Sequence, residues 1–295
     1  ARISQTMSVP PQKARTEPVT TAPTATLTRT MPKAPAIPSA PAQTKIEQPS
    51  PTATPQAQAT AKPFVPRSSE HFLVQFDGNE NSDIWTQIRS ILEYARQDMS
   101  QKFGHIPASP IHVVLHTNQN FPAEVGTPAL ADSLFDAAST TIHIPTVGAT
   151  EDLALLSRVV RHEFAHALIQ EKMGAQKHTL PTWLAEGLAI QLAEDPWPDL
   201  DDIKEQSPII IPLQSLQSRW EQIPKASLAV AYLESALASQ TLIDRYSMYG
   251  VRQVINGLQA GLSLDTAMQQ KLSVPYKEFT RQWEEGAQNA GLQPR

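Results

Sequence analysis

The sequence has 295 residues, with 26 prolines, no cysteine and a formal net charge of −5. Without cysteine it forms no disulfides and no thiolate metal sites, and it contains no run of eighteen apolar residues of the kind that spans a membrane. Residues 1–66 carry seven basic and two acidic side chains, so the other 229 residues have a net charge of −10. This acidity argues against a nucleic-acid partner, because phosphate binding needs a basic face.

Residues 1–66 hold 13 of the 26 prolines and no Gly, Trp or Tyr. Such a segment cannot bury enough apolar surface to offset its ordering entropy, so we predict a disordered linker or tether. One interpretation is a tether to a membrane anchor upstream of residue 1, another is a linker without a specific role, and a third is a proline-motif ligand. The chain begins with Ala1, which fits removal of a signal or anchor segment and equally ordinary removal of Met.

Residues 67–295 are predicted to form one folded domain, beginning with short strands and a helix. Strands are expected at His71–Phe76, Ile111–His116 and Thr140–Ile144, and a helix at 84–103 that Gly104 ends. We expect the third strand, extended to Pro145, to be the sheet edge to which a peptide substrate adds as a further strand. His143 on that strand either contacts substrate or is a surface residue.

The next predicted helix contains His162-Glu163-Phe164-Ala165-His166, an H-E-x-x-H arrangement. On a helix, positions i and i+4 share one face, so both imidazoles can reach one metal ion, and Glu163 can point at a water bound to it. Thr150 is the predicted N-cap of this helix, with Glu151 and Asp152 in its first turn. The alternative is a helix whose histidines make ordinary hydrogen bonds in the core.

Catalytic zinc takes three protein ligands and leaves a fourth position open, and the third candidate is Glu186. It lies twenty residues after His166, which is enough for a helix end at Gly174, a turn and a return helix. Pro181 and Thr182 are expected to begin that helix, with Thr182 as its N-cap. The spacing therefore predicts an αα-hairpin that carries His162, His166 and Glu186 to one point.

Two further segments complete the prediction. The acidic run at 195–202 is interpreted as a solvated loop, with a calcium site as a less favoured alternative. From Ser227 onward, apolar residues at helical spacing predict a series of helices. Tyr232 and Tyr246 belong to the apolar stripe of the first of these.

The segments HEFAH and LPTWLAEGLA resemble the gluzincin metallopeptidases, in particular the small bacterial domains called peptidase MA-like. The resemblance extends from about His71 to Trp283. It implies an α+β, zincin-like fold, with a small mixed sheet, an active-site helix and a helical C-terminal lobe. It also implies Zn²⁺ as the cofactor, with His162, His166 and Glu186 as ligands and Glu163 as general base.

The resemblance also points to Tyr232 as the donor that stabilises the oxyanion, with Tyr246 as the next candidate; the alternative is that both are core tyrosines. Two features depart from the family. No G-A-M-E-N-type segment is present, and Ile190 stands four residues after Glu186, where thermolysin-like enzymes have an Asp. The carboxylate that orients a ligand histidine is therefore unassigned.

The predicted function is zinc-dependent hydrolysis of peptide bonds in a peptide or protein substrate, with Glu163 as general base. One alternative is a non-catalytic zincin-fold module that binds peptides or proteins of the cell envelope. Another is hydrolysis of a non-peptide amide or ester, because the same constellation serves both. The resemblance and the tail together predict an extracytoplasmic location, in the bacterial cell envelope or secreted.

Overall fold

The computed structural model describes residues 67–121, 135–136, 138–195, 209–218, 220, 223–289 and 293–294. All of these belong to one compact unit of residues 59–295. The predicted linker at 1–66 lies outside the described residues, so its disorder and its boundary with the folded domain stay predictions.

A mixed five-stranded sheet forms one part of the unit, with the strand order β1-β2-β3-β5-β4. Strands β2, β3 and β5 run parallel, and β1 and β4 pair antiparallel with their neighbours. A separate parallel pair joins β6 to β7. The strands are β1 Arg67–Ser68, β2 Phe72–Asp77, β3 Ile111–Asn120, β4 Phe135–Asp136, β5 Thr141–Val147, β6 Ile209–Ile210 and β7 Gln293–Pro294.

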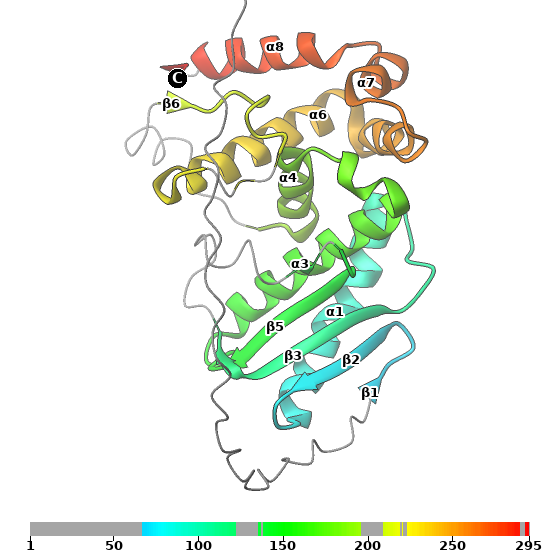
Figure 1. The fold of residues 1–295 in the computed structure, drawn as a ribbon, viewed down its shortest axis with the longest axis vertical. Coiled ribbons are helices and arrows are strands. Elements are labelled where there is room, and N and C mark those ends of the chain that lie inside the picture. Colours follow the sequence, from blue (N-terminus) through cyan, green and yellow to red (C-terminus); the bar gives the residue numbers. More distant parts are fainter. Residues whose placement is uncertain are drawn as a thin grey trace, which may run out of the picture. The chain divides into compact units, whose positions relative to one another are not determined.

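Helices make up most of the rest (Figure 1). They are α1 Ser82–Phe103, α3 Leu153–Met173, the 3-10 helix η1 Gly174–Thr179, α4 Thr182–Ala193, α6 Lys225–Gln259, α7 Leu264–Leu272 and α8 Tyr276–Asn289. Helix α6 has a non-helical residue, Ser247, in its interior. The predicted α+β class is therefore confirmed for the part of the chain that the structure describes.

Alternation along the strands decides which face of the sheet is buried. Val113 and Leu115 on β3 and Ile142 and Ile144 on β5 are fully buried. They share the face on which α1 and α3 lie (Figure 1). Intervening residues such as His143 lie on the opposite face.

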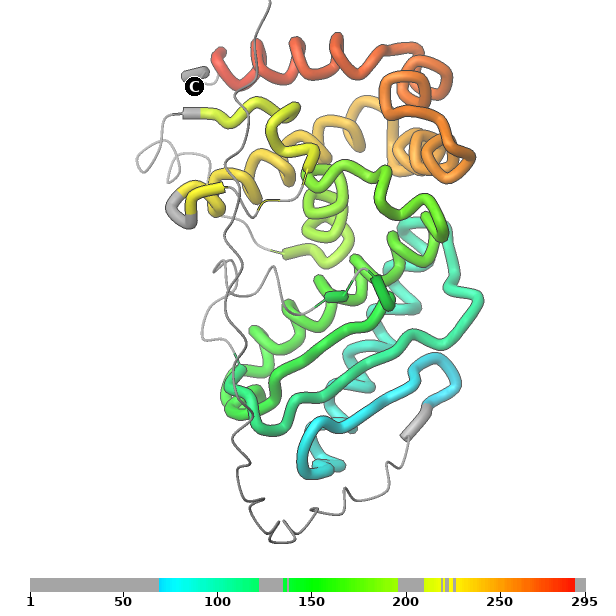
Figure 2. Tube along the Cα trace, in the orientation of Figure 1, coloured from blue at the N-terminus to red at the C-terminus, as the bar shows by residue number. Residues whose placement is uncertain are grey.

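Helix α4 connects the two parts of the unit, because it packs against both α3 and α6. Figure 2 shows this order along the trace, from the sheet and α1 through α3 and α4 to the C-terminal helices. The indole of Trp183 on α4 is fully buried and stacks on the rings of Tyr276 and Phe279 of α8, each with a centroid distance of 6.2 Å. The helix that carries the predicted third ligand is thus fixed from both sides.

The predicted helix at 84–103 is confirmed, and Gly104 ends it in a left-handed conformation with φ 68°. Gly174 likewise follows the last residue of α3. The predicted N-cap at Thr150 is wrong. Helix α3 begins at Leu153, and the Asp152 side chain accepts the backbone N–H of Leu155, because Thr150 lies two residues too early to reach that turn.

The predicted cap of α4 is also wrong, because Thr182 is the first helical residue and Pro181 is the N-cap. No side-chain cap is needed here. The backbone N–H groups of Thr182 and Trp183 donate to the carbonyls of Gln217 and Leu216, each at 3.0 Å.

The predicted edge strand, Thr140–Pro145, corresponds to β5, and β5 is not the edge of the described sheet. Phe135 and Asp136 of β4 pair antiparallel with Ile142 and Thr141 and lie outside β5. A two-residue strand carries too little pattern to be recognised in the sequence. The edge strand of the described sheet is therefore β4, and the prediction that a peptide adds at the sheet edge now applies to β4 rather than β5.

Candidate metal centre

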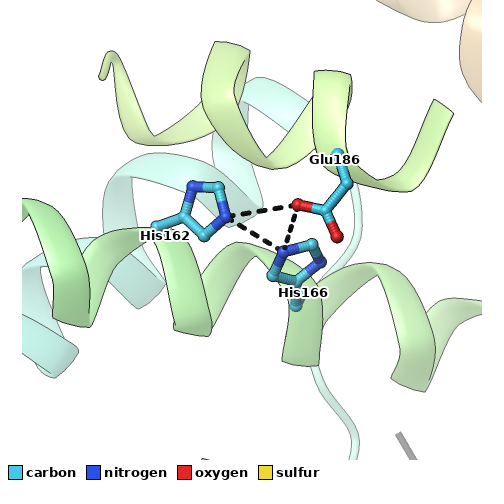
Figure 3. Close-up of side chains that lie close together, drawn as sticks. All are labelled: His162, His166 and Glu186. Carbon is cyan, nitrogen blue, oxygen red and sulfur yellow. Dashed lines mark hydrogen bonds and ion pairs between the residues drawn. The ribbon is translucent and has the colours of Figure 1, made fainter. Parts of the chain in front are cut away.

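The three predicted ligands meet between α3 and α4 (Figure 3). His162 and His166 lie one turn apart on α3, and Glu186 approaches them from α4. The Nε2 atoms of the two histidines are 3.0 Å apart. The Oε2 atom of Glu186 lies 3.6 Å from Nε2 of His162 and 3.2 Å from Nε2 of His166. Donors about 2.0–2.1 Å from a tetrahedral zinc ion lie about 3.3–3.4 Å apart, and the observed separations bracket that value.

The two imidazole rings also converge in direction. Their nitrogens are 3.0 Å apart but their centroids are 4.7 Å apart, with the rings inclined at 74°. Because the nitrogens are closer together than the centroids, both rings direct Nε2 towards the space between α3 and α4, where Oε2 of Glu186 also lies. The pair therefore has the geometry of two ligands to one ion.

An additional carboxylate, that of Asp195, bonds to Nδ1 of His162, the ring nitrogen that does not face Glu186. Its Oδ2 atom accepts a hydrogen bond from Nδ1 of His162 at 2.8 Å, and its side chain is only 7% exposed. A carboxylate accepts, so Nδ1 carries the proton and Nε2 of the neutral ring keeps its lone pair for a metal. Asp195 thus fills the orienting role that the sequence left unassigned.

The position of Asp195 corrects the interpretation of the acidic run. It was expected to be in a solvated loop, yet its side chain is buried against the ligand histidine. Glu194 adopts a left-handed conformation after the end of α4, and the N–H of Asp195 donates to the carbonyl of Ile190. This turn brings Asp195 back onto α3. The residues at 196–202 lie outside the described part of the chain.

Glu163, the predicted general base, is buried on α3 with 6% exposure. Burial raises the pKa of its carboxyl to about 7, against the opposing influence of His162 and His166 and with the help of Glu186 and Asp195. A base with a pKa near neutrality is suited to taking a proton from water and releasing it again.

The site favours positive charge at the point where the ligands meet. Burial opposes protonation of His162, yet its hydrogen bonds with Asp195 and Glu186 raise the pKa of the imidazole well above its usual value. Burial alone would raise the pKa of Glu186, but the neighbouring His166 and His162 lower it to about 2. The acidic groups around His162 therefore favour positive charge at this point, and either a proton on the imidazole or a metal ion supplies it.

The ring of Phe135 on β4 stacks on the ring of His166, with a centroid distance of 5.8 Å and an interplanar angle of 17°. The antiparallel pairing of Phe135 with Ile142 places its side chain on the α3 side of the sheet. The edge strand of the described sheet therefore contacts a ligand directly.

Tyr232 lies on α6, where its ring meets that of Trp220 edge-to-face at a centroid distance of 4.9 Å. Tyr246 lies on the same helix and packs against the core. The role of Tyr232 at the oxyanion stays a prediction. His143 bonds to His116 at 3.0 Å on the sheet face opposite α3, away from the ligand group.

A comparison with protein-family models gives no match, and a comparison with curated proteins gives none either. None of the described helices combines the length and the hydrophobicity needed to cross a bilayer. The donor set itself, two imidazoles and one carboxylate, fits zinc, and it leaves one position of a tetrahedral ion for a further ligand.

Proposed function

We propose that the protein is a zinc-dependent metallopeptidase with a zincin-like fold, in which His162, His166 and Glu186 hold the ion and Glu163 is the general base. The observation that carries the proposal is the convergence of the two Nε2 atoms and the Oε2 atom on one point, with separations of 3.0, 3.2 and 3.6 Å. The buried Glu163 beside that point favours hydrolysis over a purely structural metal site, because a structural site does not need a base.

A zinc ion bound there supplies a Lewis acid that activates water and polarises a carbonyl group. Glu163 accepts the proton of the attacking water at its carboxylate, and then delivers it to the leaving amine. Asp195 keeps the Nδ1 proton of His162 in place, so that the opposite nitrogen stays a ligand during the reaction. Phe135 limits rotation of the His166 ring by stacking on it. The hydroxyl group of Tyr232 is proposed to donate a hydrogen bond to the oxyanion.

Replacement of the base tests this mechanism. We expect Glu163→Gln to retain zinc and to lose about 10²- to 10⁴-fold in kcat, because the amide cannot accept the proton. Zinc content is measured by elemental analysis, and cleavage is measured on a denatured protein and a fluorogenic peptide library. Glu151→Gln, which changes an exposed carboxylate just before α3, is the matched control and is expected to have wild-type activity.

The outcomes separate the candidate functions. Full activity of Glu163→Gln would rule out the proposed mechanism. Zinc in the wild type without cleavage of any peptide would favour the non-catalytic peptide-binding module, and cleavage of amide or ester substrates alone would favour the non-peptide hydrolase. Absence of zinc from the wild type after reconstitution would rule out the proposed metal site itself.

A further inference from the structure

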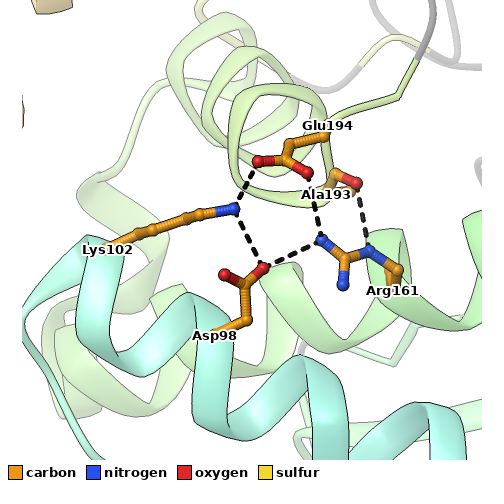
Figure 4. Close-up of polar contacts among 5 residues, drawn as sticks. All are labelled: Asp98, Lys102, Arg161, Ala193 and Glu194. Carbon is orange, nitrogen blue, oxygen red and sulfur yellow. Dashed lines mark hydrogen bonds and ion pairs between the residues drawn. The ribbon is translucent and has the colours of Figure 1, made fainter.

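An ionic cluster, buried at Arg161 and exposed at Lys102 and Glu194, lies beside the ligand group and joins three helices (Figure 4). At its centre is Arg161, the neighbour of His162 on α3, which is 8% exposed. Its Nε atom donates to the carbonyl of Ala193, the last residue of α4, at 3.1 Å. Its Nη2 atom donates to Oδ2 of Asp98 on α1 at 3.0 Å and lies 3.9 Å from Oε2 of Glu194. The guanidinium is therefore fixed in orientation by several partners.

Two of the residues that Arg161 contacts, Ala193 and Glu194, lie in the turn that carries Asp195. Glu194 has φ 56° and ψ 39°, a left-handed conformation that costs a non-glycine residue free energy. Its carboxylate forms an ion pair with Lys102, which also pairs with Asp98 at 2.9 Å. The side chains of the cluster therefore hold the turn in a conformation that glycine would otherwise be needed to provide.

Asp195 depends on this turn for its position. Its Oδ2 atom bonds to His162, while Oδ1 is buried without a hydrogen-bond partner among the residues that the structure describes. No second hydrogen bond anchors the carboxylate there, so the backbone of the turn decides where it lies. Arg161 and His162 are consecutive on α3, and they contact the same turn at two points, the carbonyl of Ala193 and the carboxylate of Asp195.

We propose that Arg161 is a positioning residue of the metal centre. It fixes the turn after α4 so that Asp195 holds the Nδ1 proton of His162, and it thereby maintains the affinity of the site for zinc. This inference rests on the proposed function only in that His162 is taken as a zinc ligand.

The test is the zinc affinity of the full chain, measured by competition with a chromophoric chelator. We expect Arg161→Met to weaken zinc binding about 10- to 100-fold, the usual effect of losing the support of a ligand histidine. Arg161→Lys keeps the charge but not the two-pronged contact, and is expected to restore part of the loss. Arg161→Met removes one of the two cationic partners of the Asp98 carboxylate and leaves Lys102 as the other, so the same measurement on Arg161→Met with Asp98→Asn guards against a simple folding defect.

A double-mutant cycle distinguishes positioning from a general structural effect. In the Asp195→Ala background, Arg161→Met is expected to change the zinc dissociation constant by less than about twofold, because the residue through which it acts is gone. Additive effects of the two substitutions, or wild-type affinity in Arg161→Met, would overturn the proposal.

Arg252 provides a matched control. It donates to the carbonyl of Phe103, the last residue of α1, at 3.2 Å and lies 5.3 Å from the ring of Tyr249. Arg161 lies 5.4 Å from the ring of Tyr94. Both arginines thus donate to the carbonyl of the last residue of a helix and lie near a tyrosine ring, but among the contacts of the described residues only Arg161 also bonds to a carboxylate. Only Arg161 is next to the proposed metal ligands, and Arg252→Met is expected to leave zinc affinity unchanged. A wild type without zinc would overturn the proposed function and this inference together, whereas zinc bound equally by wild type and Arg161→Met would overturn the inference alone.

Discussion

At the scale of single residues, two pairs of histidines have the same separation and different geometries. The nitrogens of His162 and His166 are 3.0 Å apart, and so are those of His116 and His143. In the second pair the centroids are 5.2 Å apart and the rings are inclined at only 18°, so the two nitrogens point almost directly at each other. The second pair therefore shares a proton in an N–H···N hydrogen bond.

The carboxyl group of Glu234 leads to a prediction about pH at the same scale. It is 1% exposed on α6, with Oε1 accepting the N–H of Ile211 at 2.8 Å and Oε2 unpaired among the described residues. Burial raises its pKa to about 8, against the opposing hydrogen bond from Ile211. Because the pKa in the folded protein lies above that in the unfolded chain, the stabilising contribution is complete below about pH 4.5 and is lost as pH rises towards 8.

We expect Glu234→Gln, which keeps the acceptor for Ile211 and cannot ionise, to be more stable than the wild type at pH 8 and to show a smaller fall in stability between pH 5 and pH 8. The free energy of unfolding from urea titrations at both pH values measures this. Parallel pH profiles for the two proteins would show that Glu234 is ionised in the folded state.

The candidate metal group could be predicted from the sequence because helical spacing alone brings His162 and His166 together, and because turn signals at Gly174 and Pro181 predict the return of the chain to Glu186. Asp195 could not be predicted in this way. Its position depends on a left-handed turn at Glu194, and a glutamate gives no sign of that conformation. A carboxylate just beyond the end of a ligand-bearing helix was the available signal, and its acidic neighbours made it look solvated.

At the scale of elements, the packing of α4 on α6 is set by Gly187, the residue after the third ligand. A methyl group at this position would lie 2.1 Å from the carbonyl oxygen of Ser235 and 2.1 Å from Oγ of Ser239. Because one of these atoms belongs to the backbone of α6, the clash cannot be relieved by a side-chain rotation alone. The glycine is therefore needed for the close approach of the two helices, which fixes the helix that carries Glu186.

Gly187→Ala is accordingly expected to destabilise the protein by about 1–3 kcal/mol, the usual cost of overpacking, and to weaken zinc binding by displacing Glu186. Urea unfolding and chelator competition measure the two effects. Gly286→Ala on α8 is the control, since nothing lies within 4 Å of its added methyl group, and we expect it to be neutral or to stabilise by up to about 1 kcal/mol through helix propensity. Equal stabilities for the two variants would contradict the packing argument.

At the scale of the whole molecule, periodicity in the sequence predicted the positions of β2, β3, β5 and α1, and the family resemblance implied the α+β class. The order of the strands in the sheet could not be predicted from the sequence in the same way. The two-residue edge strand β4 is recognisable only through its pairing with β5, and pairing between distant segments is not written into local spacing. The two wrong N-caps have different causes. Asp152, two residues after Thr150, caps α3, whereas the first backbone N–H groups of α4 donate to the carbonyls of Gln217 and Leu216, far along the chain.

The compact unit of residues 59–295 is expected to fold without the preceding residues. A chain beginning at residue 59 should melt within about 2 °C of the full chain, because it retains the entire described core. Thermal unfolding followed by circular dichroism measures this, with zinc affinity as a second readout. A substantially lower melting temperature would show that residues 1–58 contribute to the fold.

Both nitrogens of the His162 ring are contacted by residues on α4 or just after it. Glu186 contacts Nε2, and Asp195 contacts Nδ1. Those two residues are separated by the last two turns of α4 and the bend that follows. Each residue added to a helix rotates everything after it by about 100° and advances it by about 1.5 Å, so an insertion in this stretch would move one contact out of phase with the other. The two contacts of the His162 imidazole therefore set the length of the segment between them, and we expect an insertion or deletion between Glu186 and Asp195 to break one of the two.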